Sequence, residues 1–113
     1  MTTFDERERA YEKKFSLDQE LKFKAEARRN KLVAEWAAAK LSLSGPAIGD
    51  YVKQVVKADL SDPGQGAYLK VKKDLEDKHV GVSDAELRRA MTQFLLTAVR
   101  QIEDASLGQD RLR

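Results

Sequence analysis

The stretch that decides the fold is Val82-Ser-Asp-Ala-Glu-Leu-Arg-Arg-Ala-Met-Thr-Gln-Phe-Leu-Leu-Thr-Ala-Val-Arg-Gln-Ile102. Near its start, Ser83 and Glu86 have the S-x-x-E spacing of a capping box, which satisfies free N–H groups in the first turn of a helix. Apolar side chains then recur with the three- and four-residue spacing of an α-helix. These side chains are Leu87, Met91, Phe94, Leu95, Ala98 and Ile102. The stretch therefore predicts a long amphipathic helix that begins beside Ser83.

Three further helical segments precede this one. Clusters of Gly, Pro and Ser at 42–49, 61–66 and 81–83 separate them, because these residues favour turns. The second segment, near 45–60, carries apolar residues on one helical face. They are Ile48, Tyr51, Val52, Val55, Val56 and Leu60. No strand-like alternation and no internal repeat is present in the sequence, which predicts an all-α fold.

The third segment, near 63–79, has a thinner apolar stripe formed by Tyr68, Val71 and Leu75. We expect Pro63 at its first position, where the missing N–H group costs nothing. Asp62 would then be the N-cap.

The first segment begins with a second capping box, Ser16-Leu-Asp-Gln19. This box predicts a helix from about Leu17 to Ala39 or Leu41. The small residues of the alanine-rich stretch 34–39 permit close approach of neighbouring helices. The positions expected to face the core are Leu17, Leu21, Ala25, Leu32, Trp36, Ala39 and Leu43.

These segments predict a four-helix bundle over residues 16–106. Residues 1–15 form a separate arm before it. The periodicity is lost after Ser106, so we expect 107–113 to be a frayed tail.

The composition excludes several classes of function. The 113 residues include no cysteine, which rules out disulfides, thiolate zinc sites and cysteine nucleophiles. Lys and Arg number 21 and Asp and Glu 19, and the basic excess lies within 1–31, interleaved with acids. Nucleic-acid binding needs unopposed basic charge, so we expect no such partner. No apolar run approaches the ~20 residues of a membrane span. We therefore expect a cytoplasmic protein without direct membrane insertion.

No catalytic or metal-binding group is recognisable in the sequence. His79 is the only histidine and sits near a predicted helix C-terminus, where the helix dipole favours a cation. A single histidine without cysteines cannot build a typical zinc site. The acidic pairs Glu76-Asp77 and Glu103-Asp104 are adjacent in sequence and point to different helix faces. We expect neither an enzyme nor a cofactor-dependent protein.

Residues 1–15 differ in kind from the bundle. Phe4, Tyr11 and Phe15, with Glu8 among them, fall within about a 60° arc of a helix. That arc is narrower than the ~100° stripe of a core helix. Two interpretations stay open at this point: the segment packs on its own bundle, or it folds on docking into the groove of a partner.

Five blocks of the sequence resemble one known family. They are Phe4-Asp-Glu-Arg7, Tyr11-Glu-Lys-Lys-Phe15, Phe23-Lys-Ala-Glu-Ala-Arg-Arg-Asn-Lys-Leu32, Val55-Val-Lys-Ala-Asp59 and Val82-Ser-Asp-Ala-Glu-Leu-Arg-Arg89. The chain is similar in these blocks to the zeta subunits of alpha-proteobacterial F-type ATP synthases, which inhibit the ATPase. The resemblance spans roughly residues 3–102, and the ten residues from Phe23 to Leu32 are its most specific part.

The resemblance implies a four-helix bundle with a mobile N-terminal inhibitory arm. It implies that the arm folds as a helix into a catalytic interface between the alpha and beta subunits, with the central stalk as a further contact. Phe4, Tyr11 and Phe15 would be buried anchors, and charged residues would pair at the rim. The partner-binding residues so implied are Phe4, Arg7, Glu8, Arg9, Tyr11, Glu12, Lys13, Lys14 and Phe15. The protein would be monomeric when free and peripheral to the inner-membrane ATP synthase.

An alternative function is the binding or sensing of adenine nucleotides, with ATP or ADP as ligand. The candidate residues are Arg28, Arg29, Arg88 and Arg89, which could hold a phosphate if their helices lie side by side. Pairing with surface carboxylates is the simpler role for these arginines. A third interpretation, an enzyme whose site is not recognisable in the sequence, has no residue in its favour.

Overall fold

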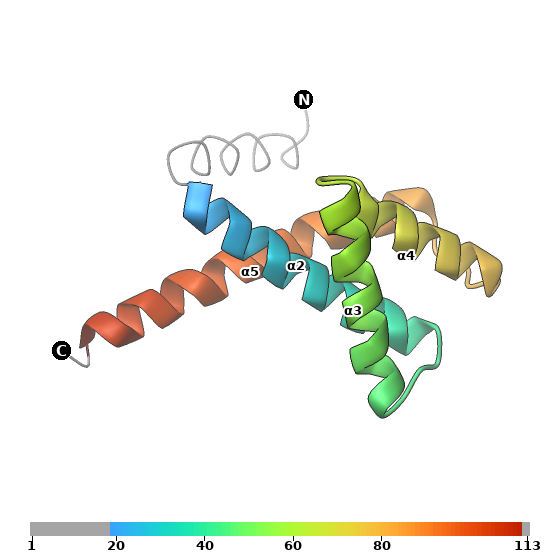
Figure 1. The fold of residues 1–113 in the computed structure, drawn as a ribbon, viewed down its shortest axis with the longest axis horizontal. Helices are drawn as coiled ribbons and strands as arrows, with labels where there is room; N and C mark the ends of the chain where they lie inside the picture. The colour runs from blue at the N-terminus through green and yellow to red at the C-terminus, as the bar shows by residue number, and fades with distance from the viewer. Residues whose placement is uncertain (1–18, 112–113) are drawn as a thin grey trace.

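The computed structural model describes the backbone of residues 19–111 and the side chains of 19–105. Within this range the chain forms four helices and no strand (Figure 1). They are α2 (Gln19–Lys40), α3 (Pro46–Ser61), α4 (Gly66–Asp77) and α5 (Asp84–Arg111). The prediction of an all-α, four-helix fold is confirmed. The predicted arm 1–15 and the capping box at Ser16 lie outside the described residues.

The two longest helices, α2 and α5, pack against each other in antiparallel directions (Figure 1). Ala25 near the start of α2 clusters with Val99 in the second half of α5. Further along α2, the Trp36 ring meets the Phe94 ring edge to face at 6.4 Å. The helix α3 packs against α2 and α4, and α4 also contacts α2 and the first turns of α5.

The main core lies where all four helices meet. Its largest fully buried side chains are Val33, Val55, Val71 and Leu87, one from each helix. Between them α2 contributes Ala34, Ala37 and Ala38, all completely buried. Such small side chains let the backbones of neighbouring helices approach closely, as the alanine-rich stretch predicted. Burying apolar surface here stabilises the fold at about 25 cal/mol per Å².

The buried face of α2 is rotated from the predicted one. Ala39 is exposed rather than buried, Trp36 is only half-buried, and Asn30 is 4% exposed. Leu60, predicted on the apolar face of α3, is 78% exposed. The close contacts are made by the alanines, so the larger Trp36 side chain fills the edge of the core, where there is more space.

Two helices end in the same way, with a residue in the left-handed conformation. Ser42 follows α2 with φ 62°, and His79 follows α4 with φ 56°. The next residue donates back across the last turn in each case: Leu43 N to Ala38 O at 2.9 Å, and Val80 N to Leu75 O at 2.9 Å. This is the Schellman arrangement, which satisfies carbonyl groups at a helix end. His79 therefore lies at a helix C-terminus, as its position in the sequence predicted.

The connection between α3 and α4 differs from the prediction. Asp62 caps the end of α3 instead of the start of α4, and its N–H group donates to the carbonyls of Ala58 and Asp59. Pro63 lies in the turn, and α4 begins only at Gly66. The Asp62 carbonyl accepts from Gly66 N at 2.8 Å. Gly64, inside this turn, has φ 87°, which is outside the helical region, so the helix cannot run on from Pro63.

The start of α5 confirms the expected N-cap. Glu86 N donates to Ser83 Oγ at 3.1 Å, which satisfies one free N–H group of the first turn. The other end differs from the expectation, because α5 continues to Arg111, past the point where the apolar periodicity stops. Charged and small residues with good helix propensity can continue a helix once packing has established it.

At Gly66 the start of α4 approaches the backbone of α3 closely. A Cβ atom added there would overlap the Ala58 carbonyl oxygen and lie 2.8 Å from Asp59 Cα. These are backbone atoms of α3, which cannot move aside as a flexible side chain can. Gly49, inside α3, is different, because an added Cβ would meet nothing within 4 Å.

The first prediction compares these two glycines. Gly66→Ala should lower the free energy of unfolding by about 1–3 kcal/mol, because the methyl group forces α3 and α4 apart. Gly49→Ala should be neutral or stabilising by up to about 1 kcal/mol, since alanine favours a helix. Urea unfolding followed by circular dichroism measures both. Equal effects of the two substitutions would contradict the close approach of α3 and α4.

Candidate functional site

The residues predicted to bind a partner all lie in 1–15, outside the described residues. Their assignment continues to rest on the sequence. The structure does describe the place where this segment joins the bundle, at the start of α2. There Leu21 packs on a small second core formed by Ala25 and Val99, together with Leu95 and Ile102. The N-terminal half of α2 is thus held to α5 by apolar contacts of its own.

A buried polar joint lies further along α2. Asn30 Nδ2 donates to Asp59 Oδ2 of α3 at 3.0 Å, and the other carboxylate oxygen accepts from Ala67 N of α4 at 3.2 Å. One carboxylate therefore connects α3 to both α2 and α4. Both ends of the Asn30 amide take part, because its Oδ1 accepts from Arg29 Nε and Nη2 at 3.2 and 3.0 Å.

The position of Arg29 affects its charge state. Burial lowers the pKa of Arg29 from its ordinary value, while the charges of Asp59 and Glu26 oppose that change. An arginine remains protonated near neutral pH even so. The Arg29 guanidinium is therefore a cation that donates to Asn30 of the joint and is attracted by the Asp59 charge.

The other three predicted arginines are exposed and lie elsewhere. Arg88 Nε donates to Asp84 Oδ2 at 2.9 Å, and its guanidinium lies over the Tyr68 ring at 4.5 Å. Arg28 lies on α2 about one turn after Ala25, which packs beside Val99 of α5. Because the two helices are antiparallel, Arg28 and Arg29 lie beside the middle of α5, whereas Arg88 and Arg89 lie at its start. The two helices are neighbours, as the nucleotide hypothesis required, but the two arginine pairs lie at different places along them.

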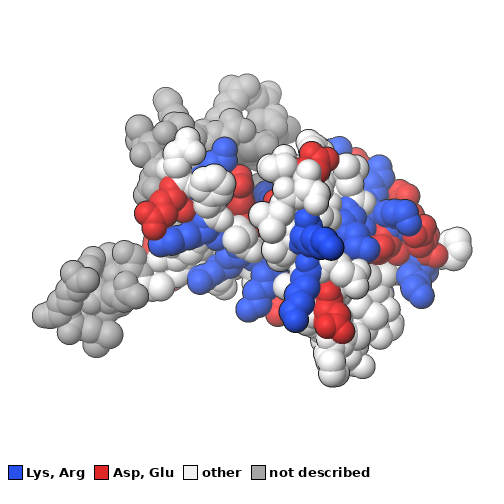
Figure 2. Space-filling model, viewed as in Figure 1, with Lys and Arg blue, Asp and Glu red and all other residues white. Residues whose placement is uncertain are grey.

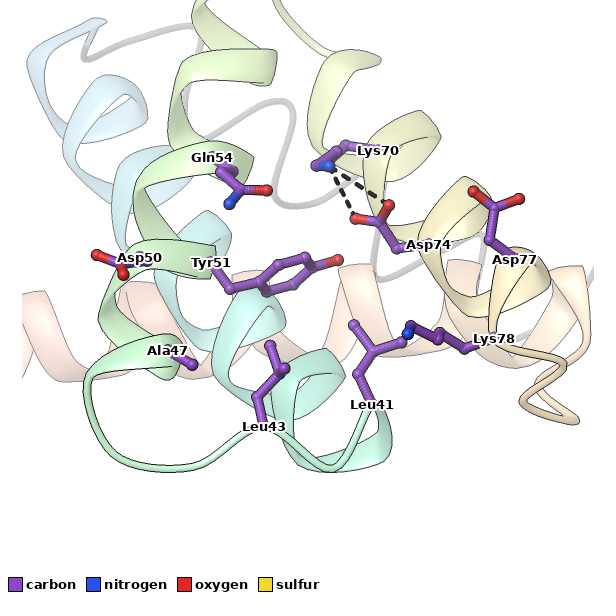
Figure 3. A pocket seen from close by; sticks show the side chains of 10 residues that line it. All are labelled: Leu41, Leu43, Ala47, Asp50, Tyr51, Gln54, Lys70, Asp74, Asp77 and Lys78. Carbon is purple, nitrogen blue, oxygen red and sulfur yellow. Dashed lines mark hydrogen bonds and ion pairs between the residues drawn. The ribbon is translucent and has the colours of Figure 1, made fainter.

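A hollow lies between α3, α4 and the loop after α2. It is a pocket of about 440 Å³. Figure 3 shows the Tyr51 ring across it, with the hydroxyl directed toward Lys70 and Asp74, whose Nζ and Oδ2 atoms are 3.0 Å apart. The lining residues are Leu41, Leu43, Ala47, Asp50, Tyr51, Gln54, Lys70, Asp74, Asp77 and Lys78. Three carboxylates against two ammonium groups give a polyphosphate no excess of positive charge to bind.

The Tyr51 hydroxyl is the group that burial perturbs most in this pocket. The residue is only 5% exposed. Desolvation raises the pKa of Tyr51 above its ordinary value, and the nearby Asp74 carboxylate raises it further, because a phenolate would face a like charge. The phenol therefore stays neutral and acts as packing and as a polar edge of the pocket, not as a base.

Two further properties of the described residues bear on function. Among the described side chains, 19–105, no three His, Asp or Glu residues are grouped so that they could hold a metal ion. None of the helices there has an apolar stretch long enough to cross a bilayer.

A comparison with known protein families decides to which family the chain belongs. The profile described as ATPase inhibitor subunit zeta matches residues 1–101. The chain belongs to the ATPase inhibitor subunit zeta family. Among curated proteins, none matches the sequence. The family is named for inhibition of an ATPase, and this description agrees with the expectation of a regulatory protein.

The structure also joins two of the sequence blocks that resemble the family. The block from Phe23 to Leu32 contains Asn30, and the block from Val55 to Asp59 ends at the carboxylate that binds it. Sequence reasoning noted both blocks and missed their contact. The available signal was an asparagine inside a helix, away from any cap, where a polar side chain needs a buried partner.

The second prediction concerns alkaline pH and Tyr51. A group with a raised pKa in the folded state stabilises the fold fully below its unfolded pKa, near 10, and loses this contribution as the pH rises further. The wild type should therefore lose up to about 1.4 kcal/mol more stability than Tyr51→Phe for the first pH unit above 10. Denaturant titrations at pH 8, 10 and 11 on both proteins measure this difference. An equal loss in both would show that Tyr51 ionises as easily in the folded state as in the unfolded chain.

Proposed function

We propose that this protein inhibits ATP hydrolysis by an F-type ATP synthase, by docking residues 1–15 as a helix into a catalytic interface between alpha and beta subunits. The observation that carries the proposal is the zeta-family match, which covers this segment together with the bundle. In the cell the protein would lie in the cytoplasm, peripheral to the membrane-bound enzyme. It would be a monomer until it binds.

The division of the chain supports this proposal physically. Both apolar clusters of the described region are built from α2 to α5. The segment 1–15 carries its own anchors, Phe4, Tyr11 and Phe15, on a narrow helical arc. A short helix with so little apolar surface is marginal in water. It gains order when a groove buries that arc, which is the way amphipathic helices recognise partners.

The expected mechanism is steric and electrostatic. A catalytic interface changes shape during hydrolysis, and a helix wedged into it opposes that change. The aromatic anchors would supply the affinity, because buried aromatic residues dominate such interfaces. Charged side chains such as Arg7 and Lys13 would pair at the rim and set orientation more than affinity. The central stalk would be a further contact of the arm or bundle.

The adenine-nucleotide alternative gains no support from the positions of the four arginines, because Arg29 donates to Asn30 and Arg88 donates to Asp84. It remains a separate prediction. Titration with ATP or ADP, followed by the fluorescence of Trp36, checks it independently of inhibition.

The third prediction removes the arm. Deletion of residues 1–15 should abolish inhibition of ATP hydrolysis and leave a cooperative, helical protein, because the described cores lie in α2 to α5. Hydrolysis by purified ATP synthase is measured against increasing inhibitor, with circular dichroism as the folding control. A truncated protein that inhibits at the same concentration would place the inhibitory element in the bundle.

The fourth prediction tests the anchors. Tyr11→Ala combined with Phe15→Ala should weaken inhibition by roughly a hundredfold or more, because each buried aromatic contributes about 1.5–3 kcal/mol and each 1.4 kcal/mol is tenfold. The melting temperature should fall by no more than a few degrees. A protein that melts far lower and still inhibits when folded would show that the two aromatics belong to the bundle core.

A further inference from the structure

Two large apolar side chains are exposed where α2 and α3 cross. Phe23 of α2 is 69% exposed and Leu60 of α3 is 78% exposed. Leu60 directly follows Asp59, which accepts from Asn30 of α2. Phe23 lies about two turns before Asn30, roughly 10 Å away along the axis of α2. Figure 1 shows that the start of α2 and the end of α3 bound one angle at this crossing, so the two side chains flank the same corner of the bundle.

Basic side chains accompany these two residues. Lys31 follows Phe23 on α2, and Lys53 and Lys57 precede Leu60 by seven and three residues on one face of α3. All three lysines are exposed and make no ion pair with the described residues. Figure 2 shows basic side chains gathered along α2 and down α3 on the viewed face. We call Phe23, Lys31, Lys53, Lys57 and Leu60 the α2–α3 corner.

The bundle itself does not require these side chains. Phe23 opens the block 23–32 and Lys57 lies within the block 55–59, the two blocks in which Asn30 and Asp59 form the buried joint. That joint gives Asn30 and Asp59 a structural role, whereas Phe23 and Lys57 are exposed and belong to neither apolar cluster of the described region. A contact outside the bundle gives these two residues a role as well.

The composition of the corner indicates the chemistry of its partner. Apolar anchors with charged residues around them are typical of protein interfaces. A membrane surface would need a broad apolar face, and the outer faces of α2 and α3 are mostly charged. A second copy of the chain would bring the same unpaired lysines together, which like-charge repulsion opposes. The corner therefore fits a protein surface that has apolar side chains at its centre and carboxylates around them.

The position of the corner along the chain brings it near the proposed interface. Phe15 precedes Gln19, the first residue of α2, by four residues, which span at most about 14 Å. Phe23 lies one turn further on, about 6 Å along the helix. A partner that holds residues 1–15 therefore has its surface within about 20 Å of Phe23. This step rests on the proposed function and on chain length alone.

We propose that the α2–α3 corner is a second docking site for ATP synthase. Phe23 and Leu60 pack on apolar side chains of the alpha or beta subunit beside the interface that residues 1–15 enter, and the three lysines face carboxylates around that contact. The second contact holds the bundle against the enzyme and raises the effective concentration of the segment that precedes α2.

The first test removes the apolar anchors. Phe23→Ala with Leu60→Ala should raise the concentration for half-inhibition roughly tenfold or more, because two interface anchors are lost. Both side chains are largely exposed, so circular dichroism and the melting temperature of the double variant should match the wild type. Leu69→Ala, at an exposed leucine of α4, is the matched control and should leave inhibition unchanged. Unchanged inhibition by the folded double variant overturns the proposal.

The second test reverses the charges. Lys53→Glu with Lys57→Glu should slow association with the enzyme about tenfold or more at low salt, because opposite charges steer the encounter. The difference should narrow at high salt, where screening weakens it. Lys73→Glu with Lys78→Glu, at exposed lysines of α4, changes the net charge equally and should have a much smaller effect. Equal effects of the two pairs would show that net charge alone acts, and would contradict an acidic surface opposite the corner.

Binding is measured apart from inhibition, so that the two proposals can fail separately. The chain has no cysteine, and a fluorophore at Ala105→Cys on α5 reports binding of the full-length protein to purified ATP synthase by anisotropy. Corner variants should bind more weakly in this assay. Wild type that does not bind the enzyme ends the proposed function, whereas wild-type and corner variants that bind equally overturn the corner alone.

A lipid control checks the choice of partner. The wild type and the corner variants are sedimented with vesicles of phosphatidylglycerol and phosphatidylcholine. We expect no sedimentation of either protein. Sedimentation of the wild type that the corner substitutions abolish, with binding to the enzyme unchanged, would assign the corner to a membrane surface and overturn the proposal.

Discussion

The carboxylate of Asp59 is the group on which the arrangement of the bundle depends. Its two oxygens bind Asn30 on α2 and the backbone of Ala67 on α4. Hydrogen bonds to a charged group contribute about 1.5–3 kcal/mol, and removing one partner leaves the other buried and unsatisfied. The contact also brings α3 against Gly66, where only a glycine fits. Helix crossing, turn geometry and close packing are thus set at one place.

Much of the fold could be predicted from the sequence, because local signals agree with the tertiary structure. The Ser83 cap and the apolar periodicity after it identify α5, and the apolar face that includes Tyr51 and Val55 identifies α3. The predictions failed where long-range contacts decide the outcome. The helix start expected at Pro63 is replaced by a turn closed through Asp62, and the alanine face of α2 is buried in preference to the face with Trp36. Neither this turn nor the choice of the buried face follows from a sequence pattern within one segment.

In the candidate site, too, local sequence patterns could be recognised and long-range contacts could not. The arm residues from Phe4 to Phe15 were identified from their narrow aromatic arc and from family resemblance, and their placement stays a prediction. The link between Asn30 and Asp59 joins residues 29 positions apart, so no spacing rule could reveal it. The bundle and the arm thus have different physical requirements. One is stabilised by its own core, and the other needs a surface to cover its aromatic residues.

The central claim is that this arm enters a catalytic interface between alpha and beta subunits. A photo-reactive benzophenone amino acid in place of Tyr11, in protein bound to inhibited ATP synthase, tests it most directly, with the same probe in place of Leu69 as the control. The account predicts adducts from position 11 to both alpha and beta subunits, and none of these from position 69. Adducts from position 11 to the central stalk alone, or the same adducts from both positions, would contradict it.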